Sequence, residues 1–503
     1  MLRSLFGTAK PYRTSRHPSS LSRLARRLTC ETLEERLCFS TGPSLWAPAD
    51  STLLGGGLPQ SPPTVAEVGQ LDLEVDPDNE NISRLSLSQV EGTIAIDPTD
   101  PSRLFAASIK SLDGLFAAYS TDAGASWTTR IMADGSDGLP AACCDPKTAF
   151  DDFGNLFLTY LHESGRKIVV ALSTDGGQTF STLHVFAYGG GVDQPSIAVG
   201  PGRRSGTGSV WVTYQTPTHE IAAAGAKVTG AGAVGSFSAP QIAPDSMAGN
   251  FGDIAVGPSG EVLATYQIRG NDVRTPKVFA SLDTDGLGNK GFRDRVLVTR
   301  TNVTKWYPIP PQATRTVDAE ANLAWDYSGG QYDGRVYLVY TDAPSPGSSD
   351  TNIFVRFSDD RGKTWSAPAE VNDDTTGTNS QFLPSIALDQ TTGNVAVVWY
   401  DARNDPANVR AQFFAAASGD GGESFSSNVQ LSVGTSDATD PDLPPFGQVM
   451  QYGDYTGLAF FGGVFYPVWA DNSTELAGNP DPPQFDLATV RVVVRTSAMQ
   501  IPL

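Results

Sequence analysis

The chain has 503 residues, with 35 Lys and Arg against 55 Asp and Glu. Its 51 Gly and 35 Pro, together with only 18% charged residues, argue against a coiled coil or a long helical bundle and favour a turn-rich, mostly β protein. No stretch approaches the roughly 18 consecutive apolar residues that a transmembrane helix needs, so we expect no membrane span.

Charge is unevenly distributed along the chain. Residues 1–29 hold seven basic side chains and no acidic one, which leaves 28 basic against 55 acidic residues, a net charge of −27, in the remaining 474 residues. A body with this charge repels polyanions, because phosphate binding needs clustered Lys and Arg. The composition therefore argues against nucleic acid as a partner.

The N-terminal part predicts three regions. Residues 1–39 form a basic leader, residues 40–70 have the Pro-, Gly- and Ser-rich composition of a flexible linker, and we expect the globular body to span residues 71–503. The run Leu33–Leu37 (LEERL), after a basic and Ser-rich start, resembles the N-terminal region of many extracellular proteins of planctomycete bacteria. This resemblance implies an exported bacterial protein, extracellular or at the cell surface.

Cysteine and histidine spacing indicates neither a disulfide framework nor a metal site. Cys30 and Cys38 lie in the leader, whereas Cys143 and Cys144 are adjacent in the body. Because neighbouring cysteines rarely pair with each other, we expect two small buried thiols there. The four histidines form no HExxH or paired Cys/His pattern, so we expect no metal and no cofactor.

Two motifs repeat along the body. One is a small residue inside an apolar triplet, and its seven central alanines recur every 49 to 72 residues: Ala95, Ala149, Ala198, Ala255, Ala324, Ala387 and Ala459. The other is a glycine followed six positions later by an aromatic: Gly154 and Tyr160, Gly208 and Tyr214, Gly260 and Tyr266, Gly334 and Tyr340, Gly393 and Trp399, Gly463 and Trp469. Each unit therefore offers at least an inner hairpin of two strands.

A third motif, Ser-x-Asp-x-Gly-x-Ser/Thr-Trp/Phe, occurs in four good copies, whose acidic residues are Asp122, Asp175, Asp360 and Asp420. These copies resemble the Asp boxes, or BNR repeats, of the sialidase superfamily. In each box the Asp can accept hydrogen bonds from its own turn and the Gly can adopt positive φ, so we expect a structural role for these four acids.

These repeats predict an all-β fold, a β-propeller of four-stranded blades. The seven alanines favour seven blades, and six, the number familiar in sialidases, is the alternative. Little chain remains after the last inner strands, so we expect a strand within residues 71–90 to complete the last blade.

Two sets of loop positions are expected to line the central face of such a propeller. Two residues after the repeated aromatic lie His162, Thr216, Ile268, Asp342, Asp401 and Asp471. Four residues before the repeated alanine lie Glu91, Asp145, Gln194, Phe251, Glu320, Leu383 and Tyr455, with Asp193 and Asp454 adjacent. Glu320 with Asp342 or Asp401 is the pair of carboxylates that we predict to be catalytic.

The sialidase resemblance implies an arginine triad that grips a sugar carboxylate, a tyrosine nucleophile helped by a glutamate, and an aspartate acid/base. Arg269, Arg315 and Arg403 lie near the predicted face, and with His162 and Asp471 they are the candidate substrate-binding residues. The first repeat opens with Val90-Glu91-Gly92 rather than with the Arg-Ile-Pro motif of sialidases.

Two functions therefore remain open. One is an exported, sialidase-like, exo-acting glycoside hydrolase on an extracellular glycan or glycoprotein, and the alternative is a non-catalytic propeller that binds glycan or protein. Convergence of the three arginines beside a tyrosine and paired carboxylates would favour the enzyme, and scattered arginines would favour binding. We expect a monomer in either case.

Overall fold

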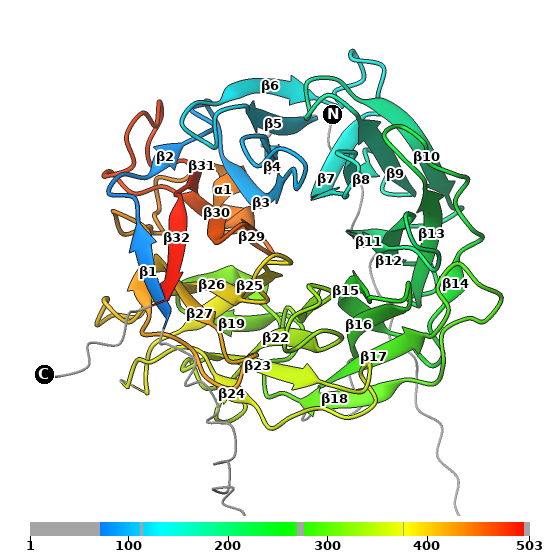
Figure 1. The fold of residues 1–503 in the computed structure, drawn as a ribbon. Helices are drawn as coiled ribbons and strands as arrows, with labels where there is room; N and C mark the ends of the chain where they lie inside the picture. The colour runs from blue at the N-terminus through cyan, green and yellow to red at the C-terminus, as the bar shows by residue number, and fades with distance from the viewer. Residues whose placement is uncertain (1–70, 111–113, 269–275, 376, 497–503) are drawn as a thin grey trace, which may run out of the picture. The chain divides into compact units, whose positions relative to one another are not determined.

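The computed structural model describes residues 71–110, 114–268, 276–375 and 377–496, so the predicted leader and linker lie outside the described residues. Seven β-sheets form a ring around a central channel, which confirms the predicted seven-bladed β-propeller (Figure 1). No helix in these ranges is long and apolar enough to cross a membrane.

In the first six blades, four antiparallel strands follow one another outward from the channel in chain order. Blades one and two contain β3 (Gln89–Ile96), β4 (Leu104–Lys110), β5 (Leu115–Ser120), β6 (Thr128–Met132), β7 (Ala142–Phe150), β8 (Leu156–His162), β9 (Lys167–Ser173) and β10 (Ser181–Ala187). Blades three and four contain β11 (Asp193–Pro201), β12 (Gly208–Gln215), β13 (Ile221–Val228), β14 (Gln241–Ile242), β15 (Gly249–Val256), β16 (Val262–Ile268), β17 (Lys277–Asp283) and β18 (Val296–Arg300). Blades five and six contain β21 (Asn322–Trp325), β22 (Val336–Asp342), β23 (Asn352–Ser358), β24 (Ala369–Glu370), β25 (Gln381–Leu388), β26 (Val395–Asp401), β27 (Gln412–Ser418) and β28 (Val429–Gln430).

The seventh blade joins the two ends of the described chain. Its inner strands are β29 (Gly457–Phe461) and β30 (Val464–Asp471), followed by β31 (Asp486–Thr489) and β32 (Val492–Thr496). The N-terminal strand β1 (Leu71–Val75) pairs antiparallel with β32, and β2 (Glu80–Asn81) pairs with β31. This confirms the expected strand within residues 71–90, which closes the ring by backbone hydrogen bonds between the first and last strands.

The repeated motifs have separate structural roles. The alanine triplets line the channel, and the repeated aromatics are at most 2% exposed. Aromatics at this position fill the contact between neighbouring blades, because each large ring removes extensive apolar surface from water. The glycine that starts the second strand has positive φ at Gly154, Gly260, Gly334, Gly393 and Gly463, where a side chain would be strained.

The Asp boxes fold as self-contained turns. In blade five the carboxylate of Asp360 accepts hydrogen bonds from the Ser358 hydroxyl (2.8 Å), the Thr364 amide (2.8 Å) and the Thr364 hydroxyl (2.7 Å). The Gly362 amide donates to the Ser358 hydroxyl at 2.8 Å, and Gly362 has φ of 80°. Asp122, Asp175 and Asp420 make the same contacts in their own boxes.

An inserted hairpin lies between blades four and five. It consists of β19 (Tyr307–Ile309) and β20 (Gln312–Val317), and it contacts the short helix α1 (Pro445–Met450) that precedes blade seven. The Gln312 side-chain amide donates to the Gly453 carbonyl (2.9 Å), and the Thr314 amide donates to the Gln451 side chain (2.9 Å). These bonds fix the hairpin against residues 451–453.

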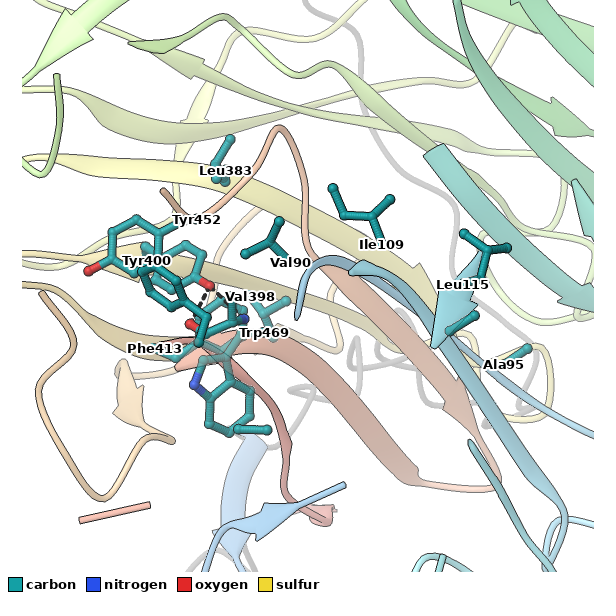
Figure 2. Packing of buried hydrophobic residues seen from close by; sticks show 14 of the residues in the cluster. Val90, Ala95, Ile109, Leu115, Leu383, Val398, Tyr400, Phe413, Tyr452 and Trp469 are labelled. Carbon is teal, nitrogen blue, oxygen red and sulfur yellow. Dashed lines mark hydrogen bonds between the residues drawn. The ribbon is translucent and has the colours of Figure 1, made fainter. Parts of the chain in front are cut away.

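A cluster of aromatic rings anchors the same segment to blades six and seven. The Tyr452 side chain is fully buried, and its ring centroid lies 4.3 Å from that of Tyr400. Phe413 stacks on Trp469 at 4.9 Å, and Figure 2 shows these four rings gathered close together. Aromatic pairs of this kind contribute about 0.5–1.5 kcal/mol beyond their buried area, so the chain just before Tyr455 is held rigidly.

The structure corrects the prediction that Cys143 and Cys144 are two free thiols. The two side chains are joined in a disulfide at the start of β7, rather than being two free thiols. The prediction was wrong because it rested on the rarity of bridges between neighbouring cysteines, and this pair is an exception to that tendency.

The closing strand generates a stability prediction. A variant that starts at residue 77 lacks β1 and exposes the edge of β32, so its melting temperature should fall by about 5 °C relative to the full chain, as measured by differential scanning calorimetry. A variant that starts at residue 66 keeps β1 and is the control. Equal melting temperatures for the two truncated chains would contradict a closing role for β1.

Candidate functional site

The innermost strands share an irregularity where they begin. The residue four positions before the channel alanine has positive φ, between 41° and 58°, at Glu91, Asp145, Gln194, Glu320 and Leu383. In blades one, two, three and six the strand pairing shifts register at this point, as it does at a β-bulge. Left-handed backbone at non-glycine residues costs on the order of 1–3 kcal/mol and is concentrated at functional sites, where it re-aims side chains.

Three of these re-aimed side chains are carboxyls, and they belong to one group of charged residues. We call it the central cluster: Glu91, Asp145, Lys147, Arg315, Asp318, Glu320, Asp454 and Tyr455. Glu91, Asp145, Asp318 and Glu320 are each at most 8% exposed. Five carboxyls and two cations thus lie together at the end of the channel where the innermost strands begin.

Arg315, on β20, is the main cation of the central cluster. Its Nε donates to Asp454 Oδ1 at 2.7 Å, and one terminal nitrogen, Nη2, donates both to Asp454 Oδ2 and to Glu91 Oε1, the latter at 3.2 Å. The other nitrogen, Nη1, makes no hydrogen bond to any described residue. Two carboxylates therefore compensate the charge of Arg315, while one donor stays available.

Glu91 is held closely from several sides. The Asp454 amide donates to its Oε1 at 3.2 Å. A Cβ on Gly453 would lie 2.4 Å from the Glu91 side chain, so only glycine fits there. Its second oxygen, Oε2, is buried and has no hydrogen-bond partner in the described structure. A buried oxygen without a partner costs free energy unless it is protonated or used by a ligand.

Lys147 and Tyr455 form a cation–π pair, with Lys147 Nζ 3.4 Å from the ring centroid. The Tyr455 hydroxyl donates to the Pro146 carbonyl at 3.1 Å. Burial, followed by the negative charges of Glu91 and Asp145, raises the pKa of Tyr455 well above its usual value. Its phenol is therefore neutral near pH 7, unlike an activated tyrosine nucleophile.

The carboxyls of the cluster have raised pKa values. Burial, and next the negative charge of Asp454, raises the pKa of Glu91 to about 7. The pKa values of Asp145 and Glu320 are raised well above normal by burial and then by neighbouring carboxylates. Lys147 opposes the shift at Glu320, while burial lowers its own pKa. The cluster therefore holds protons near neutral pH, as a general acid requires.

A small cavity opens beside Arg315. It has a volume of about 10 Å³, room for about one water molecule, and its lining includes Arg315, Asp318, Leu383, Asp454 and Trp306. The Trp306 side chain is 51% exposed. Beyond it, a cavity of about 300 Å³ follows the channel between the alanine triplets. Among the described residues, no group of His, Cys, Asp and Glu has the arrangement of a metal site.

The structure places Glu320 in the central cluster but gives the other predicted acids different partners. Asp342 accepts hydrogen bonds from the amides of Asn302 (2.7 Å) and Ala343 (2.8 Å). Asp401 accepts one from the Trp399 indole (2.9 Å). Asp471 repeats this contact with the Trp469 indole (3.0 Å). All three carboxylates hold strand ends and turns.

The arginines do not converge among the residues that the structure describes. Arg269 lies outside the described residues. Arg403 binds Asp401, donates to Asp373 at 2.6 Å and to Asn428 at 2.8 Å, and stands over the Phe414 ring, with no contact to Arg315. The His162 side chain bonds to Ser164 within its own turn. Of the candidate binding residues that the structure describes, Arg315 joins the central cluster and the others do not.

The sequence alone placed four residues on this face, but it did not show that they form one cluster: Glu91, Asp145, Asp454 and Tyr455. The signal was their shared place, at or next to the position four residues before each alanine. Lys147 and Asp318 were missed, because they lie two residues on either side of such a position and no repeat marks them. The long-range partner Arg315 sits on the inserted hairpin, which belongs to no repeat.

Comparison with known proteins agrees with the repeat assignment. The BNR/Asp-box repeat family matches residues 356–367, the box of blade five. No curated protein sequence matches the chain.

Several solved structures resemble it at low identity. The GH93 α-L-arabinofuranosidase of Fusarium graminearum has a TM-score of 0.41 at 14% identity, covering 65% of this chain and 92% of that one. The BP39L lectin of Burkholderia pseudomallei has a TM-score of 0.46 at 11% identity, covering 68% and 84%. The Hadza microbial sialidase Hz136 has a TM-score of 0.40 at 13% identity, covering 85% and 93%.

The raised pKa of Glu91 predicts a pH-dependent stability. Because the pKa of Glu91 is about 7 in the folded protein and has its ordinary value of 4.5 in the unfolded chain, stability falls as the pH rises between these two values. Glu91→Gln cannot ionise, so its melting temperature should fall less between pH 5 and pH 7.5 than that of the natural protein. Thermal unfolding at both pH values measures this.

The exposed Glu423→Gln variant is the matched control and should keep the pH dependence of the natural protein. If Glu91→Gln and the natural protein lost the same number of degrees, Glu91 would be ionised in the fold at pH 5.

Proposed function

We propose that the protein is a glycoside hydrolase that acts on neutral sugars of an extracellular glycan or glycoprotein at the central cluster. The observation that carries this proposal is the group of buried, proton-holding carboxyls at the mouth of the channel, with Glu91 Oε2 unpartnered among them. Paired carboxyls of which one stays protonated near neutral pH are what glycoside hydrolysis needs.

Glu91 suits the general acid. Its Oε1 is fixed by Arg315 and by the Asp454 amide, so the free Oε2 carries the proton that passes to the leaving oxygen of the sugar. Glu320 suits the second carboxyl, which attacks the anomeric carbon or activates water once it has lost its proton; burial and the charge of Asp318 raise its pKa, and the charge of Lys147 opposes that rise. Arg315 Nη1 and the exposed Trp306 ring are then available to a sugar hydroxyl and a sugar face.

Charge argues for a neutral sugar rather than a sialoside. Asp454 and Glu91 already compensate Arg315, and the central cluster has five carboxyls against two cations. A sugar carboxylate would find Arg315 already paired with two carboxyls, and no other described arginine contacts the central cluster. Arg403 pairs with Asp373 and Asp401, so it is not available to bind a sugar carboxylate together with Arg315. This too favours a neutral sugar.

A non-catalytic glycan-binding propeller is the second candidate. It is favoured by the small volume beside Arg315, about 10 Å³, and by carboxyls that are at most 8% exposed. On this alternative the sugar stacks on Trp306 at the surface and never reaches Glu91.

We further infer that the protein is exported, from the basic leader with its LEERL run, which lies outside the described residues, and we propose that it is a monomer. Recovery of the protein from the culture medium and its mass in solution test these two inferences. Protein found only inside the cell, or a dimer mass, would contradict them.

The proposal predicts turnover of neutral glycosides. The full chain, incubated with fluorogenic neutral glycosides, uronides and sialosides, should release the fluorophore from at least one neutral sugar. Glu91→Gln and Glu320→Gln should each lower kcat by about 100-fold or more, since each removes a group that transfers a proton or attacks carbon.

Asp360→Asn is the control, because it alters an outer Asp box and should keep full activity. Activated substrates with an acidic phenol leaving group should rescue Glu91→Gln but not Glu320→Gln, which separates an acid from a structural residue. A folded protein without turnover that still binds a neutral glycan, and loses that binding in Trp306→Ala, would establish the second candidate instead.

A further inference from the structure

A basic cavity lies between blades three and four, at the turn that joins β11 to β12. Its volume is about 560 Å³, and its charged lining residues are Arg203, Arg204 and Lys227. All three are exposed cations, and no carboxylate lines the cavity. This is unusual in a chain whose residues 30–503 have 55 acidic against 28 basic side chains.

The turn that carries the two arginines is well ordered. The Gly202 amide donates to the Thr207 carbonyl at 2.7 Å, and the Thr207 amide and hydroxyl both donate to the Arg204 carbonyl, at 3.1 and 2.7 Å. Arg203 is steadied by Asp285 at 3.7 Å. The backbone therefore presents the cations before any ligand arrives, which reduces the ordering cost of binding.

In two other blades, the arginine just before the second strand has a structural role, because it pairs with carboxylates of its own blade. In blade one, Arg103 pairs with Asp97 and Asp100. In blade five, Arg335 pairs with Asp359 at 2.7 Å. In blade three, neither Arg204 nor Lys227 forms a side-chain hydrogen bond or an ion pair with any described residue. A scaffold role explains the arginines of blades one and five but not this pair of cations.

The cavity is separate from the central cluster. Gln194 lies where β11 starts, at the cluster's end of the channel, whereas the basic turn follows Pro201, where β11 ends. Nine residues of strand separate the two sites by roughly 25–30 Å, so the cavity lies on the opposite face of the propeller.

We propose that this cavity binds a sulfate or phosphate group carried as an ester by a small ligand. Three cations that line one cavity, two from the turn and Lys227 from β13, match the several oxygens of a tetrahedral anion better than the two oxygens of a carboxylate. The negative field of the whole body repels long polyanions, which restricts the site to short ligands. This inference is independent of the proposed hydrolase activity.

Calorimetric titration of the full chain with inorganic sulfate and with inorganic phosphate tests the proposal. Saturable binding is expected for at least one anion, weaker as NaCl is raised, and at least tenfold weaker in the double variant Arg204→Ala/Lys227→Ala. Glucose 6-sulfate and glucose 6-phosphate then identify which ester is preferred.

Lys363→Ala removes one exposed positive charge elsewhere and should bind as the natural protein does. Glu320→Gln should also bind normally, so that failure of the hydrolase proposal leaves this test intact. Absence of saturable binding at about 50 mM anion, or equal binding by the double variant, would overturn the proposal.

Discussion

The seven innermost strands must meet around one axis, and this crowding governs the rest of the fold. Each strand presents a small residue at the point of closest approach, and the seven alanines Ala95, Ala149, Ala198, Ala255, Ala324, Ala387 and Ala459 line the channel together. Larger side chains at these positions would fill the channel and push the blades apart, since protein interiors are close-packed. β1 then returns to pair with β32 and completes the seventh blade.

The same geometry explains where chemistry becomes possible. Strands that converge on one axis bring equivalent positions of different blades together, so residues far apart in the sequence share one site. A left-handed residue at the start of the strand turns its side chain out of the blade. Where that residue is Glu91, Asp145 or Glu320, the carboxyl is buried at the end of the channel, and burial together with neighbouring carboxylates raises its pKa.

Much of this was predictable from sequence, for a physical reason. Blade number and the inner hairpins follow from short-range patterns, one repeated seven times and the other six times, and the closing strand follows from the short chain left after the last inner strands. The face that carries Glu320 and Glu91 follows from their fixed spacing to an alanine. The partners of the central cluster do not follow, because Arg315 comes from an inserted hairpin whose position depends on Gln312 and on the segment before Tyr455. The pairing of Cys143 with Cys144 did not follow either, because bridges between neighbouring cysteines are rare and the sequence carries no sign of this exception.

Repetition also separates structural from functional acids within a single chain. In an Asp box, both carboxylate oxygens of Asp360 accept hydrogen bonds from its own turn, and the other boxes repeat these bonds. Asp401 and Asp471 repeat a contact to the indole two residues earlier. Glu91 differs from both sets, because its Oε2 is buried without a partner and its pKa reaches about 7. A hydrogen bond that recurs in several blades is explained by the fold. A buried carboxyl oxygen without a hydrogen-bond partner, such as Glu91 Oε2, instead needs a ligand or a proton.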